Sequence, residues 1–336
     1  MNIYDISERA GVSTATVSRV INGGAKVSEK TRQKVMSVIE ELGYTPNAFA
    51  RGLGHDTMRT IGILCVDPAD PNACSSLSLS IGYLQRELRC FDYDSIIYCV
   101  GYDMKDKANC LEIMLERRVD AIMIVGSFFI EAAAKNNQCI VEAARQVPVM
   151  LINGYLKSEN VYSFLCDDQN ASLQAVSHLI ETGCRDILFL YRGLTGSEQR
   201  KLNGYTQALR IHNLPVREEY IRSCPLDIYE GRAFIEQLAA DGLAFDAAFT
   251  TEDSIAMSVL KYAHKNNVDV PAQLSILGYN NSVQSVCCYP ELSSVDNNTE
   301  AICITAVSML MRRFEGGKIP SQTTVSSNIV YRETTR

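Results

Sequence analysis

The 336-residue sequence has no long hydrophobic segment. A helix that crosses a bilayer needs about 20 apolar residues, and no uncharged apolar run of 18 residues occurs here. The first ten residues, MNIYDISERA, also lack the basic start and apolar block of a secretory signal. We therefore expect a cytoplasmic protein with no membrane contact. The apolar content of 46% is enough for two or three folded units.

The short motifs of common enzyme sites are also missing. The sequence contains no GxSxG, no GxxxxGK[ST], no HExxH, and no GxGxxG after a strand. Its four histidines, His55, His178, His212 and His264, lie in a linker or in helical segments away from strand ends. We therefore expect neither an enzyme nor a bound cofactor.

Cysteine is plentiful, but its distribution does not indicate disulfides or a metal site. The twelve cysteines are scattered through apolar runs such as GILCV and NCLEIML. Disulfide frameworks belong to small secreted domains, and the adjacent pair Cys287 and Cys288 does not match a zinc spacing. We expect reduced, mostly buried thiols and no metal.

The negative charge of the chain is unevenly distributed. Residues 1–60 hold eight Lys and Arg against six Asp and Glu, a net charge of +2, although the whole chain carries −7. The remainder is therefore acidic. A mildly basic head on an acidic body is typical of a separate DNA-facing module, since the body is repelled by the duplex.

Residues 1–45 have the pattern of a small all-α unit. Gly11 permits a tight turn, and Ser13 and Ser28 are suited to cap the helices that follow them. The expected helices are Ile3–Ala10, Thr14–Ile21 and Thr31–Leu42.

The stretch STATVSRVIN at residues 13–22 has hydroxyls where a solvated helix favours Glu, Lys or Gln. Val17, Val20 and Ile21 form one apolar face that packs inward. The outer face then carries short side chains and one guanidinium: Thr14, Ala15, Ser18, Arg19 and Asn22. Such a face fits closely against a DNA groove.

From Thr60 onward, apolar strand patterns alternate with helical ones in two successive series. This order predicts an α/β core of two doubly wound, parallel-sheet lobes, whose ligands bind in the crevice at the carboxyl ends of the strands. The predicted division is a DNA-binding head at 1–45, a hinge at 46–58, a first lobe at 59–155 plus 296–319, and a second lobe at 156–295 plus 320–336.

Several phrases, in this order, resemble one protein family. IYDISERAGVSTATVSRVINGGAKVSEKTRQKV and LGYTPNAFARGL are similar to the head and hinge of the lactose and purine repressor (LacI/GalR) family of bacterial transcriptional regulators. RRVDAIMI, HLIETGCRDILFL, TTEDSIAM, SILGYNN and YPELSSV extend the likeness through the core. The resemblance implies a helix-turn-helix head and a core like the type I periplasmic binding proteins.

The resemblance also implies how DNA is bound. A homodimer would bind a pseudo-palindromic operator. Three residues of the second helix would face base edges: Thr14, Ala15 and Arg19. Arg19 would bond to a guanine; the alternative is that it contacts only a phosphate. Leu53 would insert into the minor groove, unless it is an ordinary linker residue. The further implied DNA-binding residues are Ser13, Thr16, Ser18, Asn22, Asn47 and Ala50.

In the cleft, the resemblance implies a set of ligand-binding residues: Asp67, Asn72, Asn153, Thr195, Ser197, Lys201, Leu226, Glu252 and Asn280. Asn153 and Asn280 stand where many members of the family have acids, and Lys201 stands where they have Arg. Because paired diol contacts need planar or acidic partners, we expect a sugar-related effector with a carboxylate or phosphate near Lys201. Alternatively, each of these residues caps a loop or lies at the rim of the cleft without binding ligand. Asp253 is expected to cap the amino-terminal end of a helix.

The sequence therefore predicts a ligand-responsive transcriptional regulator, most simply a repressor, whose effector is either an inducer or a corepressor. A solute-binding receptor or an enzyme using the same two-lobed cleft is the alternative.

Overall fold

The computed structural model describes residues 3–21, 27–42, 57–68, 76–101 and 104–336. The chain forms two compact units, one comprising Met1–Thr60 with Arg118–Asp120 and the other the rest of the chain. Five of the predicted contact residues lie outside the described residues: Asn22, Asn47, Ala50, Leu53 and Asn72.

The head consists of the three predicted helices, α1 (Ile3–Ala10), α2 (Thr14–Ile21) and α3 (Glu29–Leu42). Their apolar stripes meet in one small core of Ile6, Ala10, Val17, Val20, Val35, Val38 and Ile39. The hydroxyl of Ser13 accepts a hydrogen bond from the Thr16 amide at 3.2 Å, and that of Ser28 accepts one from Thr31 at 3.3 Å. These bonds satisfy amides that the first helical turn leaves unpaired.

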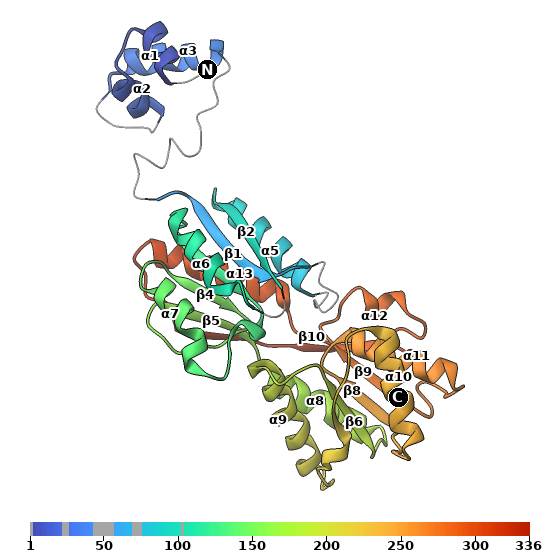
Figure 1. The fold of residues 1–336 in the computed structure, drawn as a ribbon. Coiled ribbons are helices and arrows are strands. Elements are labelled where there is room, and N and C mark those ends of the chain that lie inside the picture. The colour runs from blue at the N-terminus through green and yellow to red at the C-terminus, as the bar shows by residue number, and fades with distance from the viewer. Residues whose placement is uncertain (1–2, 22–26, 43–56, 69–75, 102–103) are drawn as a thin grey trace. The chain divides into compact units, whose positions relative to one another are not determined.

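The first lobe is built on a six-stranded sheet in the order β11-β5-β4-β3-β1-β2 (Figure 1). Its strands are β1 (Thr60–Val66), β2 (Asp94–Val100), β3 (Ala121–Val125), β4 (Val149–Ile152), β5 (Val161–Cys166) and β11 (Gln322–Val325). Its helices are α5 (Ser76–Cys90), α6 (Lys107–Glu116), α7 (Gln138–Ala144) and α13 (Thr299–Phe314), with short turns η1 (Ser127–Phe129) and η2 (Ala134–Asn137).

The second lobe has a six-stranded sheet in the order β12-β10-β9-β8-β6-β7. Its strands are β6 (Ile187–Tyr191), β7 (Ile221–Ser223), β8 (Ala247–Thr250), β9 (Ser275–Tyr279), β10 (Ser293–Asp296) and β12 (Asn328–Val330). Its helices are α8 (Asp168–Glu181), α9 (Gly196–Ile211), α10 (Ile228–Ala240), α11 (Asp253–Lys265) and α12 (Gln284–Cys287), with η3 at Glu218–Tyr220. Two separate apolar cores, one with α8 and α9 and one with α10 and α11, cover the two faces, so the doubly wound prediction is confirmed.

The predicted lobe boundaries at 156 and 320 differ from the observed sheets. Those boundaries assigned β5 and β11 to the second lobe, but β5 pairs with β4 and β11 pairs with β5 in the first sheet. The reason is that apolar alternation identifies a buried strand without identifying its neighbour, which the hydrogen-bond register decides. The chain therefore changes sheets after β5, after β10 and between β11 and β12.

Candidate functional site

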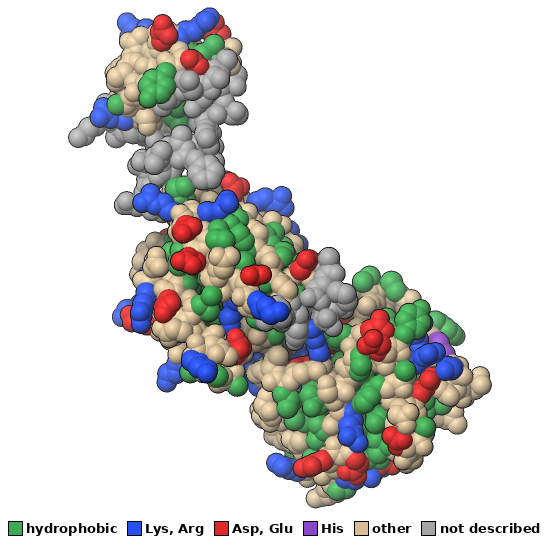
Figure 2. Space-filling view, viewed as in Figure 1, with side chains coloured by type: hydrophobic (Ala, Val, Ile, Leu, Met, Phe, Trp, Pro, Cys, Tyr) green, Lys and Arg blue, Asp and Glu red, His purple; other side chains and the backbone are tan. Residues whose placement is uncertain are grey.

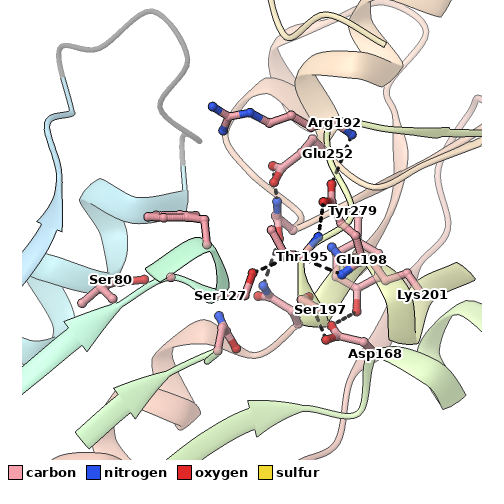
Figure 3. Close-up of a pocket in the computed structure, with 16 residues that line it drawn as sticks. Ser80, Ser127, Asp168, Arg192, Thr195, Ser197, Glu198, Lys201, Glu252 and Tyr279 are labelled. Carbon is pink, nitrogen blue, oxygen red and sulfur yellow. Dashed lines mark hydrogen bonds between the residues drawn. The ribbon is translucent and has the colours of Figure 1, made fainter. Parts of the chain in front are cut away.

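A cavity of about 80 Å³ lies where the carboxyl ends of strands from both sheets meet (Figure 3). This is the position that open α/β sheets use for ligands. Six of the predicted ligand-binding residues line it: Asn153, Thr195, Ser197, Lys201, Glu252 and Asn280. Further lining side chains that the sequence did not indicate include Ser80, Ser127, Phe128, Asp168, Arg192, Glu198, Tyr279 and Asn297.

One wall of the cavity is the amino-terminal end of α9. Thr195 and Glu198 form a capping box, in which the Thr195 hydroxyl accepts from the Glu198 amide at 3.3 Å. The buried Glu198 carboxylate accepts from the amides of Arg192 at 3.2 Å and Gly193 at 3.3 Å, and from the Thr251 hydroxyl at 3.1 Å. Glu198 therefore holds the loop that carries Thr195 and Ser197 into the cavity.

Lys201, one turn further along α9, provides a buried positive charge. Only 5% of its surface is exposed. Its ammonium donates to the Thr251 carbonyl at 3.1 Å and lies 3.7 Å from the centre of the Tyr279 ring. A cation over a desolvated aromatic face is stabilised by the ring quadrupole, so the charge is held in a defined place.

Asp168, the first residue of α8, joins several of these groups. Its carboxylate accepts from the Tyr279 hydroxyl at 2.8 Å, from the Ser197 hydroxyl at 2.8 Å and from the Arg200 guanidinium at 2.7 Å. Burial raises the pKa of Tyr279 well above its ordinary value of 10.0. The phenol is therefore a neutral donor, and the charge of Asp168 is matched by Arg200.

Hydrogen-bonded side-chain amides form another part of the cavity lining. Asn280 donates to the Glu252 carboxylate at 2.6 Å and accepts from the Asn297 amide at 2.9 Å. Asn153 and Asn280 both have left-handed backbones, with φ of 62° and 96°, which asparagine tolerates better than most residues. The left-handed turn therefore favours asparagine at both positions, in addition to any requirement of the cavity.

The two lobes touch directly beside the cavity. The Ser127 hydroxyl, at the end of β3, lies 3.0 Å from the Thr195 hydroxyl at the start of α9. A second contact joins the sheets at Cys166, the last residue of β5, whose thiol lies 3.7 Å from the Tyr279 hydroxyl. The lobe spacing at this point is consequently set by short polar contacts that a ligand can replace or reinforce.

Three predicted roles differ from the structure. Asp67 follows β1 but is exposed and does not line the cavity; its backbone amide donates to the Val100 carbonyl at 2.9 Å. Leu226 packs against the α10 and α11 core, since an apolar side chain is more stable there. Asp253 does not cap α11; its buried carboxylate accepts from the Ser282 amide, which follows β9, at 2.7 Å and from the Ser294 hydroxyl in β10 at 2.6 Å.

The outward face of α2 has the predicted exposure at Ala15 and Arg19. Val17 and Val20 are buried, whereas Ser13, Ala15 and Arg19 are exposed. Thr14, Thr16 and Ser18 are half-buried, and the Ser13 and Thr16 hydroxyls lie 2.9 Å apart. The helix thus presents small side chains around a single guanidinium.

Within the described ranges, no cluster of three or more His, Cys, Asp and Glu side chains is arranged to hold a metal ion. The helices of those same ranges include none with the length and apolarity to span a bilayer.

These features define a class of protein: a three-helix DNA-binding head joined to a two-lobed core of the periplasmic-binding-protein type. Residues 2–47 match the family of bacterial regulatory proteins called the lacI family, and residues 176–335 match the periplasmic binding protein-like domain. An HTH-type transcriptional regulator of Lachnoclostridium phytofermentans is 47% identical over 335 residues, which span 100% of this chain and 99% of that protein. The chain therefore belongs to the lacI family of bacterial transcriptional regulators.

Solved structures of similar proteins have the same fold. The Lac repressor dimer bound to operator and the anti-inducer ONPF has a TM-score of 0.87 at 22% identity, covering 100% of this chain and 99% of that one. The complex of the transcriptional regulator CelR with cellobiose has a TM-score of 0.72 at 22% identity, covering 99% of both chains. Because the relatives are transcriptional regulators, the receptor and enzyme alternatives are not favoured.

Some of the missed lining residues had a signal in the sequence. Tyr279 is the last residue of β9, and Ser127 comes two residues after the end of β3, so the rule that ligands bind at carboxyl strand ends applies to both. Asp168 comes two residues after the end of β5, so the same rule applies to it whichever sheet β5 joins.

Proposed function

We propose that this regulator is a repressor that binds a pseudo-palindromic operator as a homodimer, and that a small molecule in the cavity sets its operator affinity. The observation that carries the proposal is the polar cavity bounded by both sheets, with the lobes in contact at Ser127 and Thr195. A ligand that bonds to both lobes favours one spacing of the lobes. If that spacing also alters DNA binding, the affinity for ligand and the affinity for operator are thermodynamically linked. Its work on the chromosome would place it in the cytoplasm, on the nucleoid.

The DNA contacts proposed for the head follow the exposed face of α2. Arg19 is its long donor and would bond a guanine edge twice, while Thr14 and Ala15 offer a hydroxyl and a methyl group to neighbouring bases. Ser13, Thr16 and Ser18 would donate to phosphates. Asn22, Asn47, Ala50 and Leu53, outside the described residues, complete the proposed contact set in the turn and hinge.

The proposed effector is a sugar or sugar derivative with a carboxylate or phosphate group. The hydroxyls of Ser127 and Ser197 and the amide of Asn153 suit sugar hydroxyls, and a sugar effector agrees with the cellobiose bound by CelR. The Asp168 carboxylate already accepts four donor atoms, from Tyr279, Ser197 and the Arg200 guanidinium. The Lys201 ammonium has three N–H donors and contacts the Thr251 carbonyl and the face of the Tyr279 ring. Its buried positive charge therefore suits an anionic ligand group.

Calorimetry with matched ligands tests the effector class. The panel pairs each neutral monosaccharide and disaccharide with its sugar acid or sugar phosphate, on the wild type, Lys201→Met and Lys261→Met. Lys261 also lies over a tyrosine ring, 5.0 Å from the Tyr229 centroid, but outside the cavity. We expect an anionic compound to bind and Lys201→Met to weaken it about tenfold or more, since a charged hydrogen bond contributes about 1.5–3 kcal/mol.

Lys261→Met should leave that binding unchanged. If neutral sugars alone bind, and Lys201→Met binds them as the wild type does, the anionic class is rejected while a sugar-responsive regulator remains.

The proposed homodimer has a candidate contact face on the second lobe. Val283, Val286 and Tyr289 surround α12 and are 67%, 49% and 80% exposed. Figure 2 shows hydrophobic side chains gathered at the surface over α12. Contiguous exposed apolar groups at one place usually mark a protein–protein interface, so we propose that a second copy covers this face.

A further inference from the structure

Two cysteines on neighbouring strands of the first sheet lie opposite each other. Strands β1 and β2 are adjacent, and β2 is the edge of the sheet (Figure 1). The Asp67 amide donates to the Val100 carbonyl at 2.9 Å, and the Cys65 thiol donates to the Tyr98 carbonyl at 3.8 Å. This register places Cys65 beside Cys99, and their sulfur atoms are 3.7 Å apart.

The backbone spacing at this pair suits a disulfide. Neighbouring strands are about 4.8 Å apart, and disulfides join Cα atoms separated by about 4.4–6.8 Å. Side chains of residues that face each other on adjacent strands point to the same side of the sheet. The two sulfurs are already 3.7 Å apart as thiols, so closure to an S–S bond of about 2.05 Å requires them to approach by less than 2 Å.

The two thiols differ in access. Cys65 is fully buried, and burial raises the pKa of its thiol. Cys99 is exposed on the edge strand. A small dissolved oxidant therefore meets Cys99 first, and Cys65 is the thiol within reach of the product.

We propose that Cys65 and Cys99 form a peroxide-reactive dithiol site, which closes to an intrachain disulfide. The Cys99 thiolate attacks one oxygen of a hydroperoxide, the O–O bond breaks, and a sulfenic acid forms with release of water or an alcohol. The Cys65 sulfur then attacks the Cys99 sulfur, the S–O bond breaks, and the hydroxide that leaves takes the Cys65 proton as water. Two thiols are oxidised and one peroxide is reduced.

Other described cysteines do not share this arrangement. Cys90 and Cys287 are also exposed, but the Cys90 thiol donates to the Arg86 carbonyl in its own helix, and Cys287 adjoins Cys288 along the chain rather than facing it from a neighbouring strand. Cys110 lies within electrostatic range of Cys99, which adds to the effect of burial in raising the pKa of the Cys110 thiol. Cys110 is consequently the alternative disulfide partner for Cys99, and the experiment must distinguish it from Cys65.

The test uses the full chain with an equimolar amount of hydrogen peroxide, followed by thiol alkylation and peptide mass spectrometry. Digestion with trypsin and a protease that cuts before aspartate separates Cys65 from Cys74 and Cys99 from Cys90, which otherwise share peptides. The variants are Cys65→Ser, Cys99→Ser and, as an exposed-thiol control, Cys90→Ser. Dimedone traps any sulfenic acid, and non-reducing electrophoresis detects links between chains.

We expect a Cys65–Cys99 linked peptide in the wild type and in Cys90→Ser, reversed by dithiothreitol. Cys99→Ser should yield no linked peptide, and Cys65→Ser should accumulate dimedone-labelled Cys99. The proposal is overturned if the wild type forms no such link, if Cys99 joins Cys110 or a second chain instead, or if Cys90→Ser abolishes the link. None of these outcomes depends on which effector the cavity binds.

Discussion

We propose that sequence-specific DNA binding by the head depends most on Arg19. Around it the exposed face of α2 offers a methyl group and hydroxyls, which discriminate weakly between bases. We predict that Arg19→Ala reduces affinity for the best operator by about 1–3 kcal/mol, with a smaller loss on random duplex. Fluorescence anisotropy on both duplexes at one salt concentration measures the difference.

Arg9→Ala is the matched control for that prediction. It removes the same charge from the same head, at a side chain 57% exposed and paired with Glu41. Its effect should be small and alike on both duplexes. Equal losses on operator and random duplex for Arg19→Ala would assign Arg19 to a phosphate.

His178 predicts a pH dependence of stability. Burial lowers its pKa below the ordinary value of 6.5, and the charge of Glu181 only partly opposes this. The folded chain therefore holds the proton less tightly than the unfolded chain, and the stability that the neutral ring contributes is lost as pH falls below 6.5. His178→Gln should lose less free energy of unfolding than the wild type between about pH 8 and about pH 5.5.

Urea denaturation at both pH values measures this free energy. The exposed His264→Gln serves as the control and should follow the wild type. An identical fall in the wild type and His178→Gln would contradict the prediction.

The helices and strands show what a single sequence reveals about structure and what it does not. The three helices of the head and the alternation of the core were predictable because apolar periodicity and capping residues are local signals. The sheet to which β5 and β11 belong was not, because strand pairing depends on distant hydrogen bonds. Asp168, just after β5, carried the same strand-end signal but was overlooked, whereas Lys201 and Asn280 were reached through the resemblance to a family rather than through local pattern.

The packing of α8 against α9 depends on Gly204. A Cβ atom at this position would lie 2.2 Å from the Gln169 carbonyl oxygen and 2.8 Å from the Ser172 Cβ. We predict that Gly204→Ala lowers the free energy of unfolding by about 1–3 kcal/mol, because the backbone of α8 has to move. Chemical denaturation of the full chain measures the loss.

Gly82, in the middle of α5, is the matched control because a Cβ there meets nothing within 4 Å. Gly82→Ala should stabilise by up to about 1 kcal/mol through helix propensity. If the two substitutions have the same sign, close helix packing is not what selects glycine at 204.

For the whole molecule, the face around α12 predicts the assembly state. Tyr289→Asp should raise the dimer dissociation constant about tenfold or more, since an interface that buries an unpaired charge loses over 1.4 kcal/mol. Ile211→Asp, at the end of α9 and 58% exposed, is the control. Sedimentation equilibrium measures both; a wild type that stays monomeric, or two variants that dimerise as the wild type does, would contradict the proposed face.

The most direct test measures one linkage in both directions. An operator sequence is first selected from a pool of random duplexes, and a ligand is identified by calorimetry. The affinity of the protein for the ligand is then measured with and without operator, and its affinity for operator with and without ligand. If cavity occupancy controls DNA binding, both dissociation constants change by the same factor, of the order of 5–150, and Lys201→Met reduces the effect on operator at a ligand concentration near the wild-type dissociation constant. A ligand that saturates the cavity while operator affinity stays constant would contradict it.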